Sequence, residues 1–416
     1  MQAYTDFLAQ KRIVAPTIGR DVTPNDIHPA LFPFQRDLVA WAVRKGRAAL
    51  FADTGLGKTR MQVEWARLVG VPTMIVAPLS VARQTVREAQ KIGVDVRYVR
   101  RPDEITDGGI YITNYELIDR FDMSLFGAVV LDESSILKAL DGKTRQRLTD
   151  MCAGVDYRLC CTATPAPNDI AEIANHAEFL GVMRRVEMLA SFFIHDDTGW
   201  RLKRHAETAF YRWMASWAMS VRRPSDLGYS DDGYILPSLT VSPLWVASDY
   251  IPEGQLFFTK LEGIQGRTAV RKGTLTQRVE AAAELVNGDA QPYIVWCGLN
   301  DESNALAAAI PDAVVVEGSM SPDEKTARLE EFQDGKHRVL ITKPKIAGFG
   351  MNFQHCARMV FVGLSDSFEA YYQCIRRCYR FGQTRPVEAR IVLSDAEEAI
   401  YHNVMQKELE AQTMSQ

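Results

Sequence analysis

A short glycine-rich stretch, residues 52–59, constrains the fold of this chain more than any other segment. An apolar run at 48–51 precedes it and predicts a strand, and apolar residues at helical spacing follow it over 61–69. A strand, a glycine turn, a Gly-Lys-Thr sequence and a helix form the arrangement that cradles nucleotide phosphates. The glycines let backbone N–H groups approach the phosphates, and the helix N-terminus adds a favourable dipole. The alternative is a chance glycine-rich turn, since Ala52 stands where the general pattern begins with Gly.

The residue types in this stretch have separate chemical roles. Lys58 is predicted to neutralise the β- and γ-phosphates, and the Thr59 hydroxyl to coordinate Mg²⁺. The other loop residues expected around the phosphates are Thr54, Gly55, Leu56 and Gly57. The sequence therefore predicts a nucleotide and Mg²⁺ as cofactors.

Length and composition fit a two-domain globular protein. The chain has 416 residues, which exceeds one ordinary core, and 47% of them are hydrophobic. A net charge of −4 gives no global field for polyanions, so any nucleic-acid surface must be a local stripe. Seven irregularly spaced cysteines argue against a disulfide framework, and we find neither a membrane-spanning run nor a signal peptide. We expect a soluble, intracellular protein in a reducing compartment.

Short apolar runs that alternate with helical patterns predict two α/β lobes with parallel sheets covered on both faces. The predicted strands are residues 48–51, 73–77, 109–113, 128–131, 157–161, 293–297, 313–316, 338–342, 359–362 and 389–393. We place a lead-in at 1–30, the first lobe at 31–238 with a small helical insertion at about 182–223, and the second lobe at 239–416. Prolines mark the crossing between the lobes at Pro224, Pro237, Pro243 and Pro252.

Two further groups of residues carry chemistry in the first half. Asp132 and Glu133 end an apolar run, as do the acids that hold Mg²⁺ and orient or activate the attacking water in phosphate-loop enzymes. A surface acidic pair is the alternative. Thr162 and Thr164 follow another apolar run and suit the relay of a change at the γ-phosphate, although alone they read as a turn signal.

In the second half, Gln373, Arg377 and Arg380 fall at i, i+4 and i+7, so on a helix they would share one face. Guanidinium groups opposite a phosphate loop stabilise charge on a transferring phosphoryl group. The alternative is a solvated basic helix. The loop 343–352 ends a predicted strand with small residues and two lysines, and such a loop can approach ATP or a phosphate backbone closely.

Taken in order, these segments resemble the core of superfamily-two helicases, and specifically Swi/Snf-like DNA translocases. Segments 31–35, 52–59, 77–80 and 112–116 resemble the glutamine motif and motifs I, Ia and Ib. Asp132-Glu133 matches motif II, 162–165 with Asn168 matches motif III, 348–352 resembles motif V, and the pattern from Gln373 to Gln383 is similar to motif VI. The last two motifs also resemble compact bacteriophage-encoded members. Ser134 and Ser135 replace the Ala-His expected after the acidic pair.

The resemblance implies two tandem RecA-like lobes, with ATP in the cleft between them and nucleic acid across both. Arg377 and Arg380 would complete the site when the lobes close, and closure would step the protein along duplex or branched DNA. Gln35 would read adenine, and Gly350 and Asn352 would contact ATP. The implied coupling residues are Thr162, Thr164 and Gln373, and the implied nucleic-acid backbone contacts are Ser80, Arg83, Asn114 and Lys345.

Other functions remain open at this point. A strand-separating DNA or RNA helicase would need a wedge that sequence does not reveal, and a non-catalytic nucleic-acid clamp would not need the residues of the phosphate site. A small-molecule kinase does not explain the arginine helix. Two basic clusters, one at 200–205 and one at Arg267, Arg271, Lys272 and Arg278, extend a nucleic-acid track or else lie on solvated helix faces.

Overall fold

The structure is a computed structural model that describes residues 14–138, 143–167, 169–196, 199–247, 271–347, 351–365 and 367–413. Among the residues singled out by sequence, Asn168, Arg267 and Gly350 lie outside the described residues, as does the side chain of Ser80. The chain divides into two compact units, Met1–Asp232 and Gly233–Gln416. The sequence places this division a few residues later, before Leu239. The two units are described separately.

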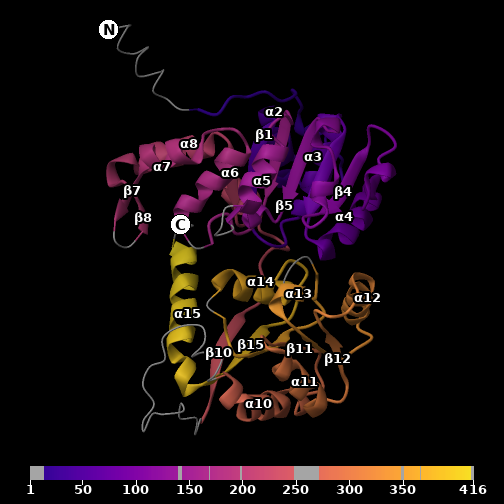
Figure 1. Ribbon diagram of the computed structural model, residues 1–416, viewed down its shortest axis with the longest axis vertical. Coiled ribbons are helices and arrows are strands. Elements are labelled where there is room, and N and C mark those ends of the chain that lie inside the picture. Colours follow the sequence, from indigo (N-terminus) through magenta and orange to yellow (C-terminus); the bar gives the residue numbers. More distant parts are fainter. Residues whose placement is uncertain are drawn as a thin grey trace. The chain divides into compact units, whose positions relative to one another are not determined.

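The first unit is built on a seven-stranded, wholly parallel sheet with the order β3-β4-β2-β5-β6-β1-β9 (Figure 1). Its strands are β1 (Arg47–Ala52), β2 (Thr73–Ala77), β3 (Val96–Tyr98), β4 (Ile110–Asn114), β5 (Ala128–Asp132), β6 (Tyr157–Cys161) and β9 (Ala218–Val221). Its helices are α2 (Pro33–Lys45), α3 (Lys58–Val69), α4 (Leu79–Lys91), α5 (Lys143–Met151), α6 (Ile173–Phe179), α7 (Arg185–Phe192) and α8 (Glu207–Ala215).

The central strands of this sheet are buried on both faces. Every residue of β2 and β5 is buried, which explains why these strands are continuous apolar runs instead of alternating ones. Pairing of parallel strands brings all their carboxyl ends to one edge of the sheet. The phosphate loop after β1, the acids at the end of β5 and the threonines after β6 therefore emerge at that edge, from three neighbouring strands.

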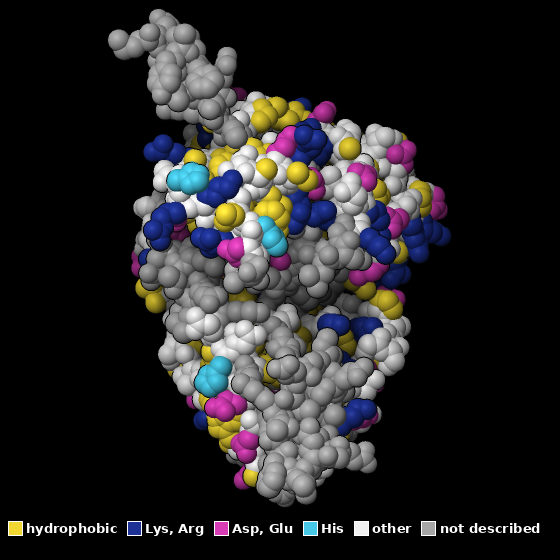
Figure 2. Space-filling view, turned by 60° about the vertical axis from the view of Figure 1, so that its left-hand side comes forward, with side chains coloured by type: hydrophobic (Ala, Val, Ile, Leu, Met, Phe, Trp, Pro, Cys, Tyr) yellow, Lys and Arg dark blue, Asp and Glu magenta, His cyan; other side chains and the backbone are white. Residues whose placement is uncertain are grey.

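The insertion in the first unit is not wholly helical. Between α7 and α8 the chain forms an antiparallel hairpin, β7 (Phe193–Asp196) and β8 (Gly199–Leu202), and the chain then returns to the sheet as β9. Phe192, Phe210 and Trp213 pack against one another and join α7 to α8. Figure 2 is turned toward the side of the first unit that carries α7 and α8, and it shows arginine, lysine and histidine side chains among apolar ones there.

The second unit has a six-stranded parallel sheet with the order β10-β15-β14-β11-β13-β12. Its strands are β10 (Leu239–Val246), β11 (Tyr293–Trp296), β12 (Ala313–Val316), β13 (Val339–Thr342), β14 (Arg358–Val362) and β15 (Val387–Ser394). Its helices are α10 (Leu275–Asn287), α11 (Asn300–Ala309), α12 (Pro322–Gln333), α13 (Pro344–Ala347), α14 (Phe368–Cys378) and α15 (Glu398–Thr413).

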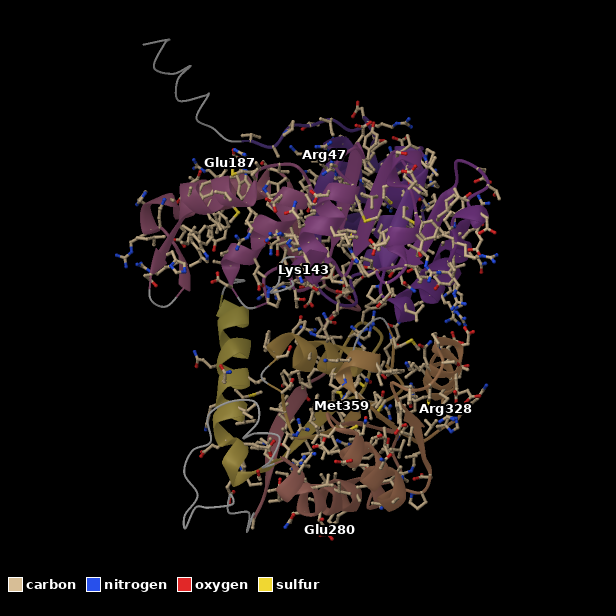
Figure 3. The ribbon with its side chains drawn as sticks, in the orientation of Figure 1. Arg47, Lys143, Glu187, Glu280, Arg328 and Met359 are labelled. Atoms are coloured by element: carbon tan, nitrogen blue, oxygen red, sulfur yellow. The ribbon has the colours of Figure 1, made fainter. Side chains whose placement is uncertain are left out.

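Two separate apolar clusters cover the two faces of this second sheet. Ile294 and Trp296 of β11 belong to one cluster, which includes side chains of α12, α14 and α15, and Met359 lies inside it (Figure 3). Tyr293 and Val295 belong to the other cluster, which includes side chains of α10 and α11. The alternation along β11 is the period of two that a strand imposes on its side chains.

The predicted fold class is confirmed: both units are α/β and each is built on one parallel main sheet, as in RecA-like lobes. All ten predicted strands are present, within one or two residues of their predicted ends. We predicted that Pro243 marks the crossing between the lobes, but it lies within β10 of the second unit. Proline is tolerated there because β10 is an edge strand, which has one side free of ladder hydrogen bonds. None of the helices in the described part of the chain has the length and hydropathy that a bilayer crossing requires.

Candidate active site

The phosphate loop is held in place by a glutamine from the preceding helix. Gln35 on α2 is 3% exposed, and its Nε2 donates to the carbonyl oxygen of Leu56 at 2.8 Å. Its Oε1 accepts from the Phe32 backbone N–H at 2.9 Å. Both ends of the amide are therefore bonded to the protein, so Gln35 ties the loop to the start of α2. Its predicted contact with adenine stays a prediction.

Two glycines let the loop take its conformation. Gly55 has φ +90° and Gly57 has φ +81°, values in the left-handed region that side chains rarely adopt. A Cβ at Gly57 would also lie 2.3 Å from Gln35 Nε2. Gly57 is the N-cap of α3, so the backbone turns from the loop directly into the helix. A helix N-terminus after a glycine turn suits an anion.

The lysine of the loop lies over the loop itself. Lys58 Nζ donates to the carbonyl oxygens of Ala52 at 2.8 Å and Asp53 at 3.4 Å. Thr59, the next residue, is half-buried in the first turn of α3. Burial raises the pKa of Asp132, and the charge of Lys58 partly opposes this rise, so the ammonium lies near the end of β5.

The two acids at the end of β5 differ in their surroundings. Asp132 is 4% exposed, and its burial, together with the neighbouring Glu133, raises its pKa to about 6. The amide of Gln62 on α3 partly opposes this rise in the pKa of Asp132. Gln62 is fully buried, yet neither its Nε2 nor its Oε1 meets the geometry of a hydrogen bond with a described residue.

Glu133 has an unusual backbone. Its φ is +52°, and it is the only residue other than glycine with a positive φ in the described part of the chain. Such a conformation is strained and clusters at functional sites. Thr162 Oγ1 lies 3.5 Å from Glu133 Oε2, and the backbone N–H of Thr164 donates to Thr162 Oγ1 at 3.1 Å. The structure thus brings together Glu133 and the two predicted coupling threonines.

Three neighbours of this site were missed by the sequence reasoning. Tyr115 donates from its hydroxyl to the Asp132 carbonyl oxygen at 2.7 Å, and Gln62 lies beside the Asp132 carboxyl. His176 Nε2 is 3.1 Å from Ser134 Oγ, and burial lowers the pKa of His176 to about 4. His176 gave no sequence signal, since it lies 42 residues along the chain from Ser134. Gln62 stands one turn after Lys58 on α3, and that spacing was its signal.

These residues fit a nucleotide and a magnesium ion. Mg²⁺ usually keeps several waters and takes only one or two protein oxygens, so Asp132 and Thr59 make a sufficient donor set. The amide of Gln62, buried beside the Asp132 carboxyl, is in place to hydrogen-bond a water molecule in such a shell. A Cβ at Gly57 would collide with the Gln35 amide, so glycine lets the turn lie this close to α2.

The arginine segment of the second unit is only partly helical. Gln373 and Arg377 lie on α14, which ends at Cys378, so Arg380 lies beyond the helix. The prediction that Arg380 shares one helix face with them is wrong. Arg377 is 2% exposed and donates to Gln373 O, Gln373 Oε1 and Met351 O at 2.8 to 3.0 Å. Arg380 is half-buried. Arg377 therefore ties α14 to the loop around Met351, and Arg380 is the more accessible guanidinium.

A glutamine fixes the turn after α14. Gln383 Nε2 donates to the carbonyl oxygens of Gln354, Cys356 and Cys378 at 3.0 to 3.2 Å. Its Oε1 accepts from the backbone N–H groups of Thr384 and Arg385. Gln383 and Arg377 thus join residues 351–356 and the end of α14 into one hydrogen-bonded piece. Asn352 lies in this piece, half-buried, with its Oδ1 lacking a partner among described residues.

The predicted nucleic-acid contacts are placed differently from one another. Arg83 on α4 and Lys345 on α13 are exposed. Asn114, at the end of β4, is 4% exposed, and its Nδ2 lies 3.4 Å from Tyr98 Oη. Arg83 and Lys345 are therefore exposed to a phosphate, whereas the side chain of Asn114 is buried at the carboxyl end of its strand.

Two arginines of the second basic cluster, Arg271 and Arg278, are held by a buried carboxylate, whereas Lys272 is exposed. Arg278 is fully buried and donates to Glu302 at 2.9 Å, and Arg271 makes a forked pair with the same carboxylate at 2.8 to 2.9 Å. Both guanidiniums also donate to the carbonyl oxygen of Val362. This ion network lies inside the second unit, so Arg278 lies neither on a nucleic-acid track nor on a solvated helix face, and Arg271 binds the same carboxylate.

Comparison with known proteins gives similarity along most of the chain. Residues 278–382 match the family model "Helicase conserved C-terminal domain". Three curated relatives share the description "DNA annealing helicase and endonuclease ZRANB3": that of Bos taurus is 22% identical over 425 residues, that of Mus musculus 25% over 426, and that of Homo sapiens 23% over 429. Each alignment covers 90% of this chain but only 39–40% of the relative.

Among solved structures, the Sulfolobus solfataricus SWI2/SNF2 ATPase core in complex with dsDNA matches with a TM-score of 0.46 and 18% identity, over 95% of this chain and 98% of that one. The family match covers the helicase C-terminal segment of the second unit, from Arg278 on α10 to Gly382, and this segment includes Gln373, Arg377 and Arg380. The chain is thus similar to DNA helicases over most of its length, and its second lobe matches the conserved C-terminal domain of helicases.

Proposed function

We propose that this protein is an ATP-dependent DNA translocase of the Swi/Snf-like group of superfamily two. One observation carries the proposal: the neighbouring strands β1, β6 and β5 end at one edge of the first sheet, where Lys58, Asp132, Glu133 and Thr162 meet. That set can bind phosphates and a magnesium ion and can position a water. The match of residues 278–382 to a helicase C-terminal domain supports a second lobe that acts with the first.

In the proposed reaction, Lys58 and the loop amides bind the phosphates, and Thr59 and Asp132 would hold Mg²⁺, which neutralises charge on the β- and γ-oxygens when bound. Glu133 orients the attacking water and accepts its proton. Arg380 of the second lobe stabilises charge on the transferring phosphoryl group. Arg377 is buried and bonded within its own lobe, so we assign it the positioning of the loop around Met351 and Asn352.

Hydrolysis is proposed to be tied to movement on DNA. Arg380 completes the site only when the lobes close, and each closure shifts the backbone contacts made by Arg83 and Lys345. Those contacts go to phosphates, so binding is sequence-independent and weakens as salt rises. DNA as the substrate is supported by relatives described as DNA annealing helicases, although the chain spans only 39–40% of their length. The resemblance to bacteriophage-encoded members remains a prediction from sequence, and if the protein is phage-encoded, its predicted location is the cytoplasm of a bacterial host.

The test compares ATP turnover with single-stranded, duplex and forked DNA and with RNA, using Lys58→Ala as the inactive control. Stimulation by duplex DNA, with displacement of a third strand from a triplex but no separation of a fork, supports translocation. Separation of the fork would instead support a strand-separating helicase. Absence of hydrolysis with every nucleic acid, together with binding to DNA, would replace the proposal with a non-catalytic clamp.

A further inference from the structure

The hydroxyl of Tyr115 makes a hydrogen bond that connects two separate parts of the first unit. Tyr115 is the first residue after β4, its side chain is 5% exposed, and its hydroxyl donates to the carbonyl oxygen of Asp132 at 2.7 Å. In the sheet, β4 and β5 are not neighbours but lie on either side of β2. The Tyr115 side chain therefore reaches past the end of β2 to the end of β5.

The acceptor of this bond belongs to the peptide group between Asp132 and Glu133, which is held by two hydrogen bonds. The peptide between Asp132 and Glu133 has its carbonyl bonded to Tyr115 and its N–H donating to Asp132 Oδ1 at 3.1 Å. Glu133 then turns with φ +52°, and its own carbonyl accepts from the Ile136 N–H at 3.2 Å. Because the backbone conformation of Glu133 is strained, it persists only while such bonds hold it. The direction of the Glu133 carboxylate thus depends on the orientation of this peptide.

The other end of Tyr115 is next to one candidate nucleic-acid contact. Asn114 immediately precedes it, and Arg83 lies exposed on α4, the helix that follows β2. A shift of the backbone at the end of β4 would move the Tyr115 ring with it, because close packing leaves the buried ring no room to move independently. Burial also raises the pKa of the Tyr115 hydroxyl well above its usual range, so the group stays a proton donor.

A further inference rests on the proposed function. We propose that Tyr115 is a positioning residue: DNA bound at the ends of β4 and β2 sets the orientation of Glu133 through it. Tyr115 touches neither ATP nor the attacking water. When DNA displaces the Asn114–Tyr115 backbone, the ring carries that displacement to the Asp132 carbonyl. The peptide then rotates, and Glu133 takes the direction needed to orient water. DNA binding thereby changes the orientation of the catalytic acid through contacts within one lobe.

Tyr115→Phe removes only the hydroxyl, and β4, the strand that precedes Tyr115, offers a matched control. Tyr111 is also fully buried, and its hydroxyl accepts from the backbone N–H groups of Thr106 and Asp107 at 3.1 Å, at the opposite end of β4. The measured quantity is the ratio of kcat with saturating duplex DNA to kcat without DNA. We expect Tyr115→Phe to lower this ratio on the order of tenfold or more, with DNA affinity unchanged, and Tyr111→Phe to keep the wild-type ratio.

The outcomes separate this inference from the proposed function. A wild-type chain without hydrolysis on any nucleic acid overturns both. A wild-type ratio in Tyr115→Phe, or an equal fall in Tyr111→Phe, overturns the role of Tyr115 alone. If Tyr115→Phe does not fold, hydrogen–deuterium exchange of wild-type peptides that contain Glu133 decides the matter: duplex DNA without nucleotide should change their exchange, and unchanged exchange would contradict the inference.

Discussion

Gly57→Ala should destabilise the phosphate loop more than backbone strain alone can explain. At φ +81° an alanine costs about 1–2 kcal/mol relative to glycine. Its Cβ would also lie 2.3 Å from Gln35 Nε2, which would push that amide off the Leu56 carbonyl that it now meets at 2.8 Å. Leaving a buried polar group unpaired costs about 1–3 kcal/mol. We therefore expect a total loss of about 2–5 kcal/mol and weaker nucleotide binding.

Gly93→Ala is the matched control, because Gly93 has φ +68° in the same unit and an added Cβ there would meet nothing within 4 Å. Hydrogen–deuterium exchange over α2 and α3, with urea unfolding, measures the loss in each variant, and a fluorescent ATP analogue measures affinity. The Gln35→Ala background should remove the excess penalty of Gly57→Ala. Equal losses in the two glycine variants, or an excess that survives in Gln35→Ala, would refute the clash between loop and helix.

Three further predictions follow from the site. Lys58→Ala should lower ATP turnover at least about a hundredfold while circular dichroism stays unchanged, and turnover near wild type would remove Lys58 from phosphate binding. Arg377→Ala should destabilise the second unit by about 2–4 kcal/mol in thermal denaturation, since it leaves Gln373 and Met351 oxygens unpaired; an unchanged melting temperature would contradict its structural role. Because burial lowers the pKa of His176 to about 4, the unfolded chain binds more protons between pH 6.5 and 4. Stability should therefore fall by at most about 3 kcal/mol as the pH drops through that window, and His176→Phe should flatten the slope; an unaltered slope in that variant would point to other groups.

The positions of most strands along the chain and the glycine turn of the first lobe were predictable because they depend on local patterns. Runs such as β2 and β5 are apolar throughout since both sheet faces are covered, and the glycine turn specifies its own backbone. Strands at the edges were harder. β10 contains Pro243 and only partly buried or exposed residues, so its pattern resembles a linker, and only pairing with β15 makes it a strand.

Contacts made over long sequence separations set the limits of the prediction. The spacing of Gln373, Arg377 and Arg380 suggested one helix face. The helix, however, ends at Cys378, whose carbonyl oxygen accepts a hydrogen bond from the Gln383 side chain. Arg271 and Arg278 looked like a basic surface because their partner, Glu302, lies 31 and 24 residues away. Charge along the sequence does not reveal which cations a carboxylate will bury.

The central claim is that an arginine of the second lobe completes the phosphate site of the first. DNA-stimulated ATP turnover of Arg380→Ala at saturating ATP and duplex DNA tests it most directly, with the ATP affinity of the same variant as the internal control. We predict a fall in kcat of roughly a thousandfold with ATP affinity changed only a few fold, as expected for a guanidinium that acts on the transferring phosphoryl group. Wild-type turnover in Arg380→Ala would contradict a shared site.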